Sequence, residues 1–266
     1  MNKKGLLVVS FGTSHHDTRE KNIVRLETLL AEAFPDRTCY RAYTSKMILD
    51  ILKKRDGLTL PTVPMAMEQL IQEGITDLLV QPTHIMNGLE NEQMKEDIML
   101  WKNQLDSLAF GAPLLTSTRD QEDLIRAVME EFPSLKETEA LMFMGHGSSH
   151  YANTVYAALD YAFKHQGHPH VYVGTVEAYP DLDTVMEDLK REHIRRVTLA
   201  PLMLVAGDHA QNDMAGPGPH SWRSVLAGQG YRVDWVRHGL GSEKAVQDLY
   251  AAHLRGVLQE DGAHGL

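Results

Sequence analysis

Short apolar runs of strand length alternate with segments of helical periodicity along almost the whole chain. Two of the clearest runs are Leu6-Leu7-Val8-Val9 and Leu141-Met142-Phe143-Met144. Such runs are typical of parallel strands that are covered by helices on both faces. We therefore predict an α/β fold, with strands near 5–12, 38–44, 77–85, 112–116, 140–145, 170–176, 196–205 and 231–236.

Amphipathic segments between these runs predict the helices, and they divide the chain into two similar halves with four strands each. The expected helices are 18–33, 46–54, 62–73, 90–106, 119–131, 151–165, 181–192, 220–228 and 242–258. We predict two similar Rossmann-like lobes, 1–130 and 131–266, each with a four-stranded parallel sheet flanked by helices and with a cleft between them. The final helix could pack across onto the first lobe.

Local sequence matches support this internal repeat. Val9-Ser10-Phe11-Gly12-Thr13 corresponds to Phe143-Met144-Gly145-His146-Gly147, because both segments end a first strand in glycine. The segment 79–88 aligns with 198–207, and proline and glycine stand at matching offsets in the two. The third strand of each half is thus expected to end in the same way.

Composition and charge exclude several classes of protein. The chain has 266 residues, and 26 Lys and Arg against 36 Asp and Glu give a net charge of −10, so we expect no nucleic-acid partner. A single cysteine, Cys39, excludes an internal disulfide and a multi-thiolate metal site. We find no apolar run long enough to cross a membrane and no secretory signal, so we expect a cytoplasmic protein without a membrane partner.

Three metal-competent side chains follow three successive strands of the second half. His146 lies between Gly145 and Gly147, Glu177 follows the strand 170–176, and His209 follows the strand 196–205. Ligands of open parallel sheets bind beyond the carboxyl ends of the strands, so these side chains can converge on one ion. Two imidazoles and a carboxylate with an open position suit a catalytic first-row metal such as zinc, iron or cobalt.

Other histidines allow structural interpretations. His84 ends the third strand of the first lobe and could face the cleft or form part of its wall, and His150 could cap the following helix. Arg237-His238-Gly239 is similar to the motif of histidine phosphatases, but that family carries the motif on its first strand, which argues against this activity. Lys46 and Arg41 are candidates for a local basic pocket, although either could simply be an exposed charge.

Five motifs together resemble the anaerobic sirohydrochlorin cobaltochelatases of the CbiK type, a family of class II chelatases. They are Phe11-Gly12-Thr13-Ser14, His84-Ile85-Met86-Asn87-Gly88, Gly145-His146-Gly147-Ser148, Val176-Glu177-Ala178-Tyr179-Pro180 and Gly207-Asp208-His209-Ala210. The resemblance spans the whole chain. It implies a chelatase-like fold and ATP-independent insertion of Co2+ into sirohydrochlorin or precorrin-2, in the early-cobalt route to cobalamin.

The resemblance also assigns roles to particular residues. It implies that His146, Glu177 and His209 are the metal ligands and catalytic residues, and we expect Ser10, Gly12, Thr13 and His84 to position the substrate. Co2+ would be the substrate metal, with Fe2+, Ni2+ or Zn2+ as substitutes and no organic cofactor. Some relatives form oligomers, so a homo-oligomer stays open.

Two other functions remain compatible with the same residues. One is a sirohydrochlorin ferrochelatase that makes sirohaem, because metal choice depends partly on supply. The other is a non-catalytic carrier of a metal or a tetrapyrrole, built on the same two lobes. A His–Glu–His site without a fourth protein ligand favours an enzyme over a carrier.

Overall fold

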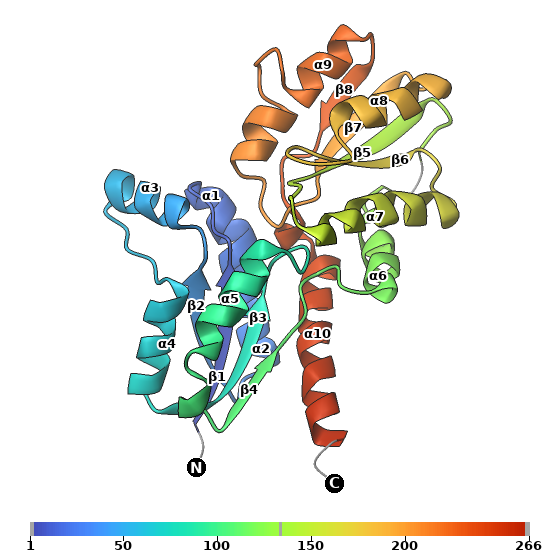
Figure 1. Ribbon diagram of the computed structural model, residues 1–266. Coiled ribbons are helices and arrows are strands. Elements are labelled where there is room, and N and C mark those ends of the chain that lie inside the picture. The colour runs from blue at the N-terminus through green and yellow to red at the C-terminus, as the bar shows by residue number, and fades with distance from the viewer. Residues whose placement is uncertain (1–2, 133–134, 264–266) are drawn as a thin grey trace. The chain divides into compact units, whose positions relative to one another are not determined.

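The computed structural model contains two four-stranded parallel sheets with the same strand order, and it describes residues 3–132 and 135–263, with side chains as far as residue 259. The strand orders are β2-β1-β3-β4 and β6-β5-β7-β8 (Figure 1). In each sheet the second strand in sequence pairs with one side of the first strand, and the third strand pairs with its other side. This makes a topological switch point between the first and third strands of each sheet.

The first sheet is formed by β1 (Lys3–Ser10), β2 (Thr38–Tyr43), β3 (Ile75–Pro82) and β4 (Ser107–Phe110). Leu7, Val9 and Val80 belong to an apolar cluster with Met67 of the helix α4. Leu6, the neighbour of Leu7 in β1, is also completely buried. Because neighbouring strand residues point to opposite faces, both faces of this sheet are covered.

The helices that belong with the first sheet begin and end largely where the sequence predicts. They are α1 (His16–Thr18), the π-helix η1 (Arg19–Val24), α2 (Arg25–Ala33), α3 (Lys46–Asp56), α4 (Val63–Gln72), α5 (Leu89–Met99), the 3-10 turn η2 (Lys102–Gln104) and α10 (Lys244–Ala263). The Ser45 side chain accepts a hydrogen bond from the Ile48 amide at the start of α3, and Gly57 ends this helix with a φ of 67°. These caps satisfy backbone groups that have no partner within the helix.

The second sheet is formed by β5 (Glu139–Gly145), β6 (Val171–Thr175), β7 (Arg196–Pro201) and β8 (Arg232–Trp235). The Phe143 and Phe163 rings stack with centroids 5.6 Å apart, while Met142 and Leu199 pack with Leu189 in another cluster. Helices therefore cover both faces here as well. They are α6 (Thr118–Met129), the 3-10 turn η3 (Tyr151–Asn153), α7 (Thr154–His165), α8 (Leu182–Arg191), the π-helix η4 (Ala210–Met214), α9 (Trp222–Gly228) and the 3-10 turn η5 (Leu240–Ser242).

The chain divides into two compact units, and their boundaries differ from the expected lobes 1–130 and 131–266. Unit 1 comprises Met1–Thr116 and Lys244–Leu266, and unit 2 comprises Ser117–Glu243. The helix α6 belongs to unit 2 because it packs with α7, and α10 belongs to unit 1 because it contacts α2, β3 and β4. In Figure 1 the red helix α10 runs beside the sheet of unit 1. The Tyr250 hydroxyl of α10 is buried and donates to the Thr83 carbonyl at 2.9 Å.

One predicted strand and one predicted helix are wrong in position. The segment 112–116 is not a regular strand, and the helix expected over 90–106 ends at Met99, so that Ser107–Phe110 forms β4 instead. β4 is a short edge strand that is only partly buried, and its sequence therefore lacks a strong apolar run. Leu114 and Leu115 are buried in an irregular segment, in which Leu115 makes an isolated bridge with Met86.

Equivalent backbone hydrogen bonds confirm that the third strands end alike. The Thr83 amide donates to the Val9 carbonyl at 2.8 Å, and the Leu202 amide donates to the Met144 carbonyl at 2.8 Å. These bonds place Val9 opposite Met144 in the repeat, one residue later than the alignment drawn from the sequence. Gly12 then matches Gly147, and both have a positive φ, of 106° and 89°.

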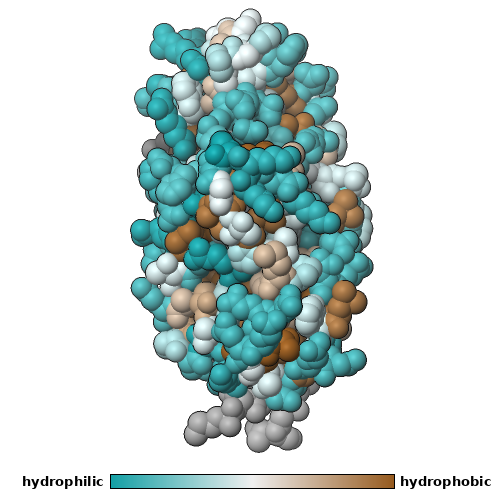
Figure 2. Space-filling view, turned by 90° about the vertical axis from the view of Figure 1, so that its left-hand side faces the viewer, coloured by the Kyte–Doolittle hydropathy of each residue, from teal (hydrophilic) through white to brown (hydrophobic). Residues whose placement is uncertain are grey.

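Among the described residues, no helix is sufficiently long and apolar to cross a membrane. The face in Figure 2 is covered mainly by hydrophilic side chains, and hydrophobic side chains are interspersed among them in small groups.

Candidate metal centre

His146, Glu177 and His209 come together beyond the carboxyl ends of β5, β6 and β7. β5 lies between β6 and β7, so the three segments that carry these residues leave neighbouring strands at the same edge of the sheet. This edge includes the switch point between β5 and β7, where open α/β sheets bind their ligands. The convergence predicted from the order of strands and residues is confirmed.

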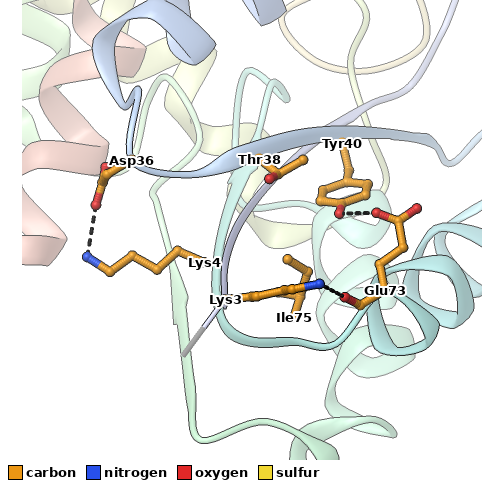
Figure 3. Close-up of a pocket in the computed structure, with 7 residues that line it drawn as sticks. All are labelled: Lys3, Lys4, Asp36, Thr38, Tyr40, Glu73 and Ile75. Atoms are coloured by element: carbon orange, nitrogen blue, oxygen red, sulfur yellow. Dashed lines mark hydrogen bonds and ion pairs between the residues drawn. The ribbon is translucent and has the colours of Figure 1, made fainter. Parts of the chain in front are cut away.

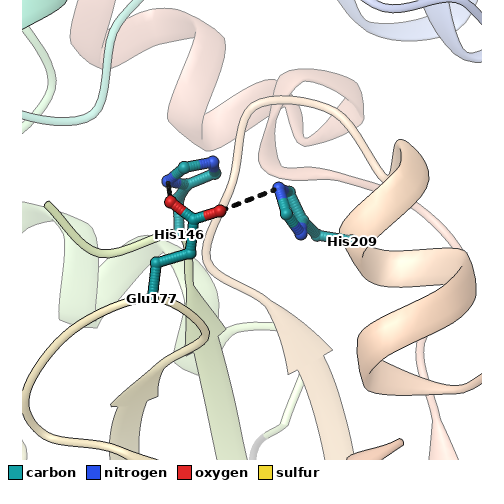
Figure 4. A group of neighbouring side chains, drawn as sticks. All are labelled: His146, Glu177 and His209. Atoms are coloured by element: carbon teal, nitrogen blue, oxygen red, sulfur yellow. Dashed lines mark ion pairs between the residues drawn. The ribbon is translucent and has the colours of Figure 1, made fainter.

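The three side chains point toward one another (Figure 4). Glu177 Oε2 lies 3.7 Å from His146 Nδ1, and Glu177 Oε1 lies 4.0 Å from His209 Nε2. The imidazole centroids are 4.6 Å apart with the rings nearly perpendicular, and one ligand atom from each residue lies within 4.8 Å of the others. Donor atoms around a tetrahedral ion with bonds of about 2.1 Å lie about 3.4 Å apart, so small rotations suffice to bind one ion.

The segments that carry His146 and Glu177 are held together by their backbones. The Val176 amide donates to the Gly145 carbonyl at 3.0 Å, and the Glu177 amide donates to the His146 carbonyl at 2.9 Å. Asn153 joins the same two segments, because its side chain accepts from the Ser148 amide at 2.9 Å and donates to the Tyr179 carbonyl at 2.5 Å. The spacing between His146 and Glu177 is therefore set by the scaffold.

Glycines on either side of His146 are required by close packing. A Cβ at Gly145 would lie 2.3 Å from the Tyr156 ring, and a Cβ at Gly147 would lie 2.8 Å from the Ala178 backbone nitrogen. Gly147 also has a φ of 89°, a backbone conformation that residues with a side chain rarely adopt. The two glycines thus let the His146 segment turn sharply against the Glu177 segment.

His209 is oriented by Asp213, four residues later in the π-helix η4. His209 Nδ1 lies 2.7 Å from Asp213 Oδ2, so a proton on Nδ1 is donated to the carboxylate and the lone pair of Nε2 is free. This free nitrogen is the atom that faces Glu177. A carboxylate behind an imidazole ligand fixes its tautomer and increases its basicity, as in many metal centres.

His146 has a neutral partner instead of a carboxylate. Its Nδ1 lies 2.9 Å from the Gly147 carbonyl oxygen and 3.7 Å from Glu177 Oε2, so the tautomer protonated at Nδ1 satisfies the carbonyl and leaves Nε2 as the nitrogen with a lone pair for an ion. The two imidazoles therefore differ in their support, although they face the same carboxylate.

The residues expected to position a substrate lie in unit 1. Ser10 ends β1 and is 1% exposed, and its hydroxyl accepts from the Thr83 hydroxyl at 2.8 Å. Gly12 makes the turn after β1, and the buried Thr13 hydroxyl accepts from the His15 amide at 3.3 Å. These contacts stabilise the turn itself, and a role of Ser10, Gly12 or Thr13 toward the substrate stays a prediction.

His84 follows β3 and is an unusual group within unit 1. Both of its ring nitrogens are buried without a hydrogen-bond partner among the described residues. Burial lowers the pKa of His84 to about 4, so the imidazole is neutral at pH 7. A neutral, unpartnered imidazole keeps a hydrogen-bonding capacity that a substrate could use, which leaves the expected role open.

Two hollows lie at the opposite edges of the sheets and do not contain these residues. One, of about 470 Å3, is lined by Lys3, Tyr40 and Glu73 near the amino ends of β1, β2 and β3 (Figure 3). Its polar groups are bonded to one another, as in the 2.6 Å bond from Tyr40 to Glu73. The other, of about 650 Å3, lies near the amino ends of β5, β7 and β8. Neither position is the edge where a ligand of this fold is expected.

Comparison with known proteins identifies the family. The family model described as cobalt chelatase (CbiK) matches residues 4–259. The chain belongs to the cobalt chelatase family. The chain is 44% identical over 256 residues to the sirohydrochlorin cobaltochelatase of Salmonella typhimurium strain LT2, a match that covers 96% of this chain and 97% of the relative.

A second curated relative supports this membership, and a solved structure supports the fold. The sirohydrochlorin cobaltochelatase CbiKC of Nitratidesulfovibrio vulgaris strain Hildenborough is 32% identical, with 96% of this chain and 90% of that protein covered. The structure of SirB from Bacillus subtilis with Fe3+ has a TM-score of 0.68 at 14% identity and 98% coverage of both chains. The chelatase-like fold predicted from the sequence is thereby confirmed.

Two residues near the centre, Asp213 and Asn153, were not predicted from the sequence. Asp213 lies four residues after His209, a spacing that places both on one side of a helical turn, so this signal could have been used. Asn153 carried no such signal, because its partners lie in two loops that meet only in the fold. The prediction that His150 caps a helix is confirmed by the bond of 3.2 Å from the Ala152 amide.

Proposed function

We propose that this chain is a sirohydrochlorin cobaltochelatase, in which His146, Glu177 and His209 hold Co2+ before it enters the macrocycle. The observation that carries the proposal is the His–Glu–His set at the carboxyl edge of the second sheet. Family membership and the names of the two curated relatives support the metal and the substrate.

The donor set suits a metal that must leave again. Three protein ligands leave open coordination positions, which water or the pyrrole nitrogens can occupy. The side chains of His146, Glu177 and His209 are 43%, 55% and 32% exposed, so the ion can be exchanged from solvent. A closed set of four ligands would instead retain the ion as a structural element.

The same residues can accept the protons that metal insertion releases. A free-base ring has two pyrrolic protons, and both must leave when a divalent ion takes their place. Imidazole takes up protons near neutral pH, so His146 and His209 can each accept one proton after the ion departs. The Asp213 carboxylate stabilises a protonated His209, because it already binds Nδ1–H of this ring. Glu177 lowers the net charge of the bound ion.

Residues of unit 1 would bind and position the ring. We propose that Gly12 provides the turn and that His84 contacts the substrate, with Ser10 and Thr13 shaping the same segment. Sirohydrochlorin carries many carboxylates, so the net charge of −10 has to be overcome by nearby cations, and salt limits long-range repulsion to about 8 Å. Lys46 is exposed and suits this task, whereas Arg41 is bound to the buried Glu27 at 2.7 Å.

Finer aspects of the activity belong to the same proposal. We propose that the enzyme needs neither ATP nor an organic cofactor, and that it acts in the cytoplasm in the early-cobalt route to cobalamin. Precorrin-2 is a second candidate substrate, and Fe2+, Ni2+ and Zn2+ are candidate substitutes for Co2+. A homo-oligomer is a candidate assembly of this chain. We propose neither a nucleic acid nor a membrane as a partner.

An anaerobic absorbance assay tests the function. Purified protein is mixed with sirohydrochlorin and Co2+, without ATP, and the change in the spectrum of the ring is followed. We expect insertion well above the uncatalysed rate, and an unchanged rate would rule out the chelatase function. A parallel reaction with Fe2+ separates the two chelatases, because a larger kcat/KM for Fe2+ would identify a ferrochelatase.

A further inference from the structure

A second group of metal-competent side chains lies in unit 2 and shares no residue with the proposed chelatase centre. It consists of Glu131 after α6, His238 after β8 and Glu243 directly before α10. One ligand atom from each residue lies within 4.8 Å of the others. We propose that these three residues bind a second divalent first-row cation, such as Zn2+ or Co2+.

Two carboxylates face the same imidazole nitrogen, and one proton cannot satisfy both. His238 Nε2 lies 2.8 Å from Glu243 Oε1 and 3.4 Å from Glu131 Oε1. If Nε2 carries a proton, it bonds well to Glu243 and leaves Glu131 at a distance too long for a good hydrogen bond. If Nε2 carries a lone pair, three acceptors face one another. A cation between them satisfies all three groups.

The charges around His238 also favour a divalent ion. The two carboxylates carry a charge of −2, and a protonated imidazole compensates only half of it. The cationic residues next to this group in the sequence are engaged elsewhere, since the Arg237 guanidinium lies 5.5 Å from the Trp235 ring centre and the Lys244 ammonium binds Asp248. A divalent ion with a neutral His238 balances the charge completely. The mixture of imidazole and carboxylate suits zinc or cobalt better than magnesium.

The segment between His238 and Glu243 is held in place by its backbone. The Leu240 amide donates to the Met203 carbonyl at 2.9 Å, and the Gly241 amide donates to the Leu204 carbonyl at 2.8 Å. Gly239 allows this approach, because a Cβ there would lie 2.5 Å from the Leu204 carbonyl oxygen. Two of the three ligands therefore come from an ordered segment, which lowers the entropic cost of ion binding.

The three side chains are half-buried, with exposed fractions of 37%, 41% and 32%, so an ion can enter from solvent. The ion would join the end of α6 to the segment that leads into α10. We expect it to stabilise unit 2, because a ligand that binds only the folded state raises the unfolding temperature.

Cobalt binding to a chain without the chelatase ligands tests this site. In the variant His146→Ala/His209→Ala, equilibrium dialysis against Co2+ should find one ion per chain, together with a rise in unfolding temperature on addition of Co2+. Adding His238→Ala should remove both effects, and Glu131→Gln should weaken both. His193→Ala, at an exposed histidine, is the matched control and should change neither.

Two results would overturn the second site. One is the absence of bound Co2+ in His146→Ala/His209→Ala, and the other is binding that persists after His238→Ala. Unfolding temperatures in the presence of EDTA verify that each variant is folded, and Glu131→Gln provides the test should His238→Ala fail to fold. The outcome is independent of chelatase activity, because the parent variant lacks two ligands of the proposed chelatase centre.

Discussion

Units 1 and 2 have the same sheet topology, yet among the described residues a group of side chains that could hold a metal lies at the carboxyl edge of the sheet in unit 2 and not in unit 1. Equivalent backbone bonds identify the matching positions. The Glu177 amide donates to the His146 carbonyl at 2.9 Å, and the Ser45 amide donates to the Phe11 carbonyl at 3.2 Å. Phe11 thus stands where unit 2 has His146, and Ser45 stands where unit 2 has Glu177.

The third position follows from the glycines that precede it. Gly88 and Gly207 occupy matching places, and the carbonyl of each accepts a bond of 3.0 Å from the amide four residues later. Glu90 of unit 1 therefore corresponds to His209 of unit 2. The fold supplies three matching positions in both units, and we propose that the side chains at these positions decide which unit binds a metal.

The different lengths of the loops explain part of this divergence. In unit 1, α3 begins directly after Ser45, and the Ser45 side chain is used to cap it. In unit 2, α8 begins five residues after Glu177 and is capped by Asp181, so Glu177 is free to serve as a ligand. The longer loop separates the capping residue from the residue that we propose as a metal ligand.

The largest effect is expected from removal of the imidazole ligands. His146→Ala and His209→Ala should each lower kcat/KM for Co2+ insertion by at least about a hundredfold, because even partners behind metal ligands typically contribute 10–100-fold. Phe11→Ala at the matching position of unit 1 is the control and should leave Co2+ affinity unchanged. Dialysis and the insertion assay measure both quantities, and near-normal turnover in both His variants would refute the centre.

Asp213 has no polar counterpart in unit 1, since the matching residue is the buried Met94. Asp213→Asn should weaken Co2+ binding by about 10–100-fold, because His209 loses its carboxylate partner. Asp213→Glu, which keeps the charge, should recover part of this loss. Equal Co2+ affinity in the wild type and Asp213→Asn, measured by dialysis, would show that this carboxylate does not support the ligand.

His84, whose ring nitrogens are buried, makes the stability of unit 1 sensitive to acid. The pKa of about 4 in the folded state lies below the unfolded value of about 6.5, so the unfolded state binds more protons between these values. The free energy of unfolding should therefore decrease by about 2 kcal/mol as the pH falls from 6.5 toward 4.5, because each unit of pKa difference corresponds to about 1.36 kcal/mol.

The buried Glu27 has the opposite effect, because burial raises its pKa to about 7, and its contribution is lost as the pH rises through that value. Comparison with His84→Leu isolates the histidine. Denaturant unfolding at pH 7 and pH 4.5 should show a smaller acid loss in the variant, and an equal loss in both chains would contradict the assignment.

The smallest effect is expected at Ser45. Ser45→Ala should lower the free energy of unfolding by about 1 kcal/mol, the usual cost of a lost N-cap, without changing Co2+ affinity. Its counterpart Glu177→Gln should do the reverse, with weaker Co2+ binding and little change in stability. Urea unfolding and dialysis of the two variants measure this contrast, and a stability loss confined to Glu177→Gln would overturn the comparison.

The order of elements could be predicted from the sequence because the strands β1, β3, β5, β6 and β7 contain apolar runs. The three proposed ligands could be found because each follows such a run. β4 was misplaced since an edge strand that is only half covered needs no such run. The packing of the final helix α10 onto unit 1 agrees with the expectation from the sequence, and the bond from Tyr250 to Thr83 is one of its contacts. The start of unit 2 at Ser117 was not predicted, because α6 joins this unit through its packing with α7.

In the proposed function, unit 2 holds the substrate metal between His146, Glu177 and His209. A crystal of the protein soaked with Co2+ and measured at the cobalt absorption edge locates the ion directly. We predict an anomalous peak bonded to both imidazoles and to the Glu177 carboxylate at about 2.0–2.2 Å. Cobalt found only at other residues, with these three side chains unligated, would contradict the account.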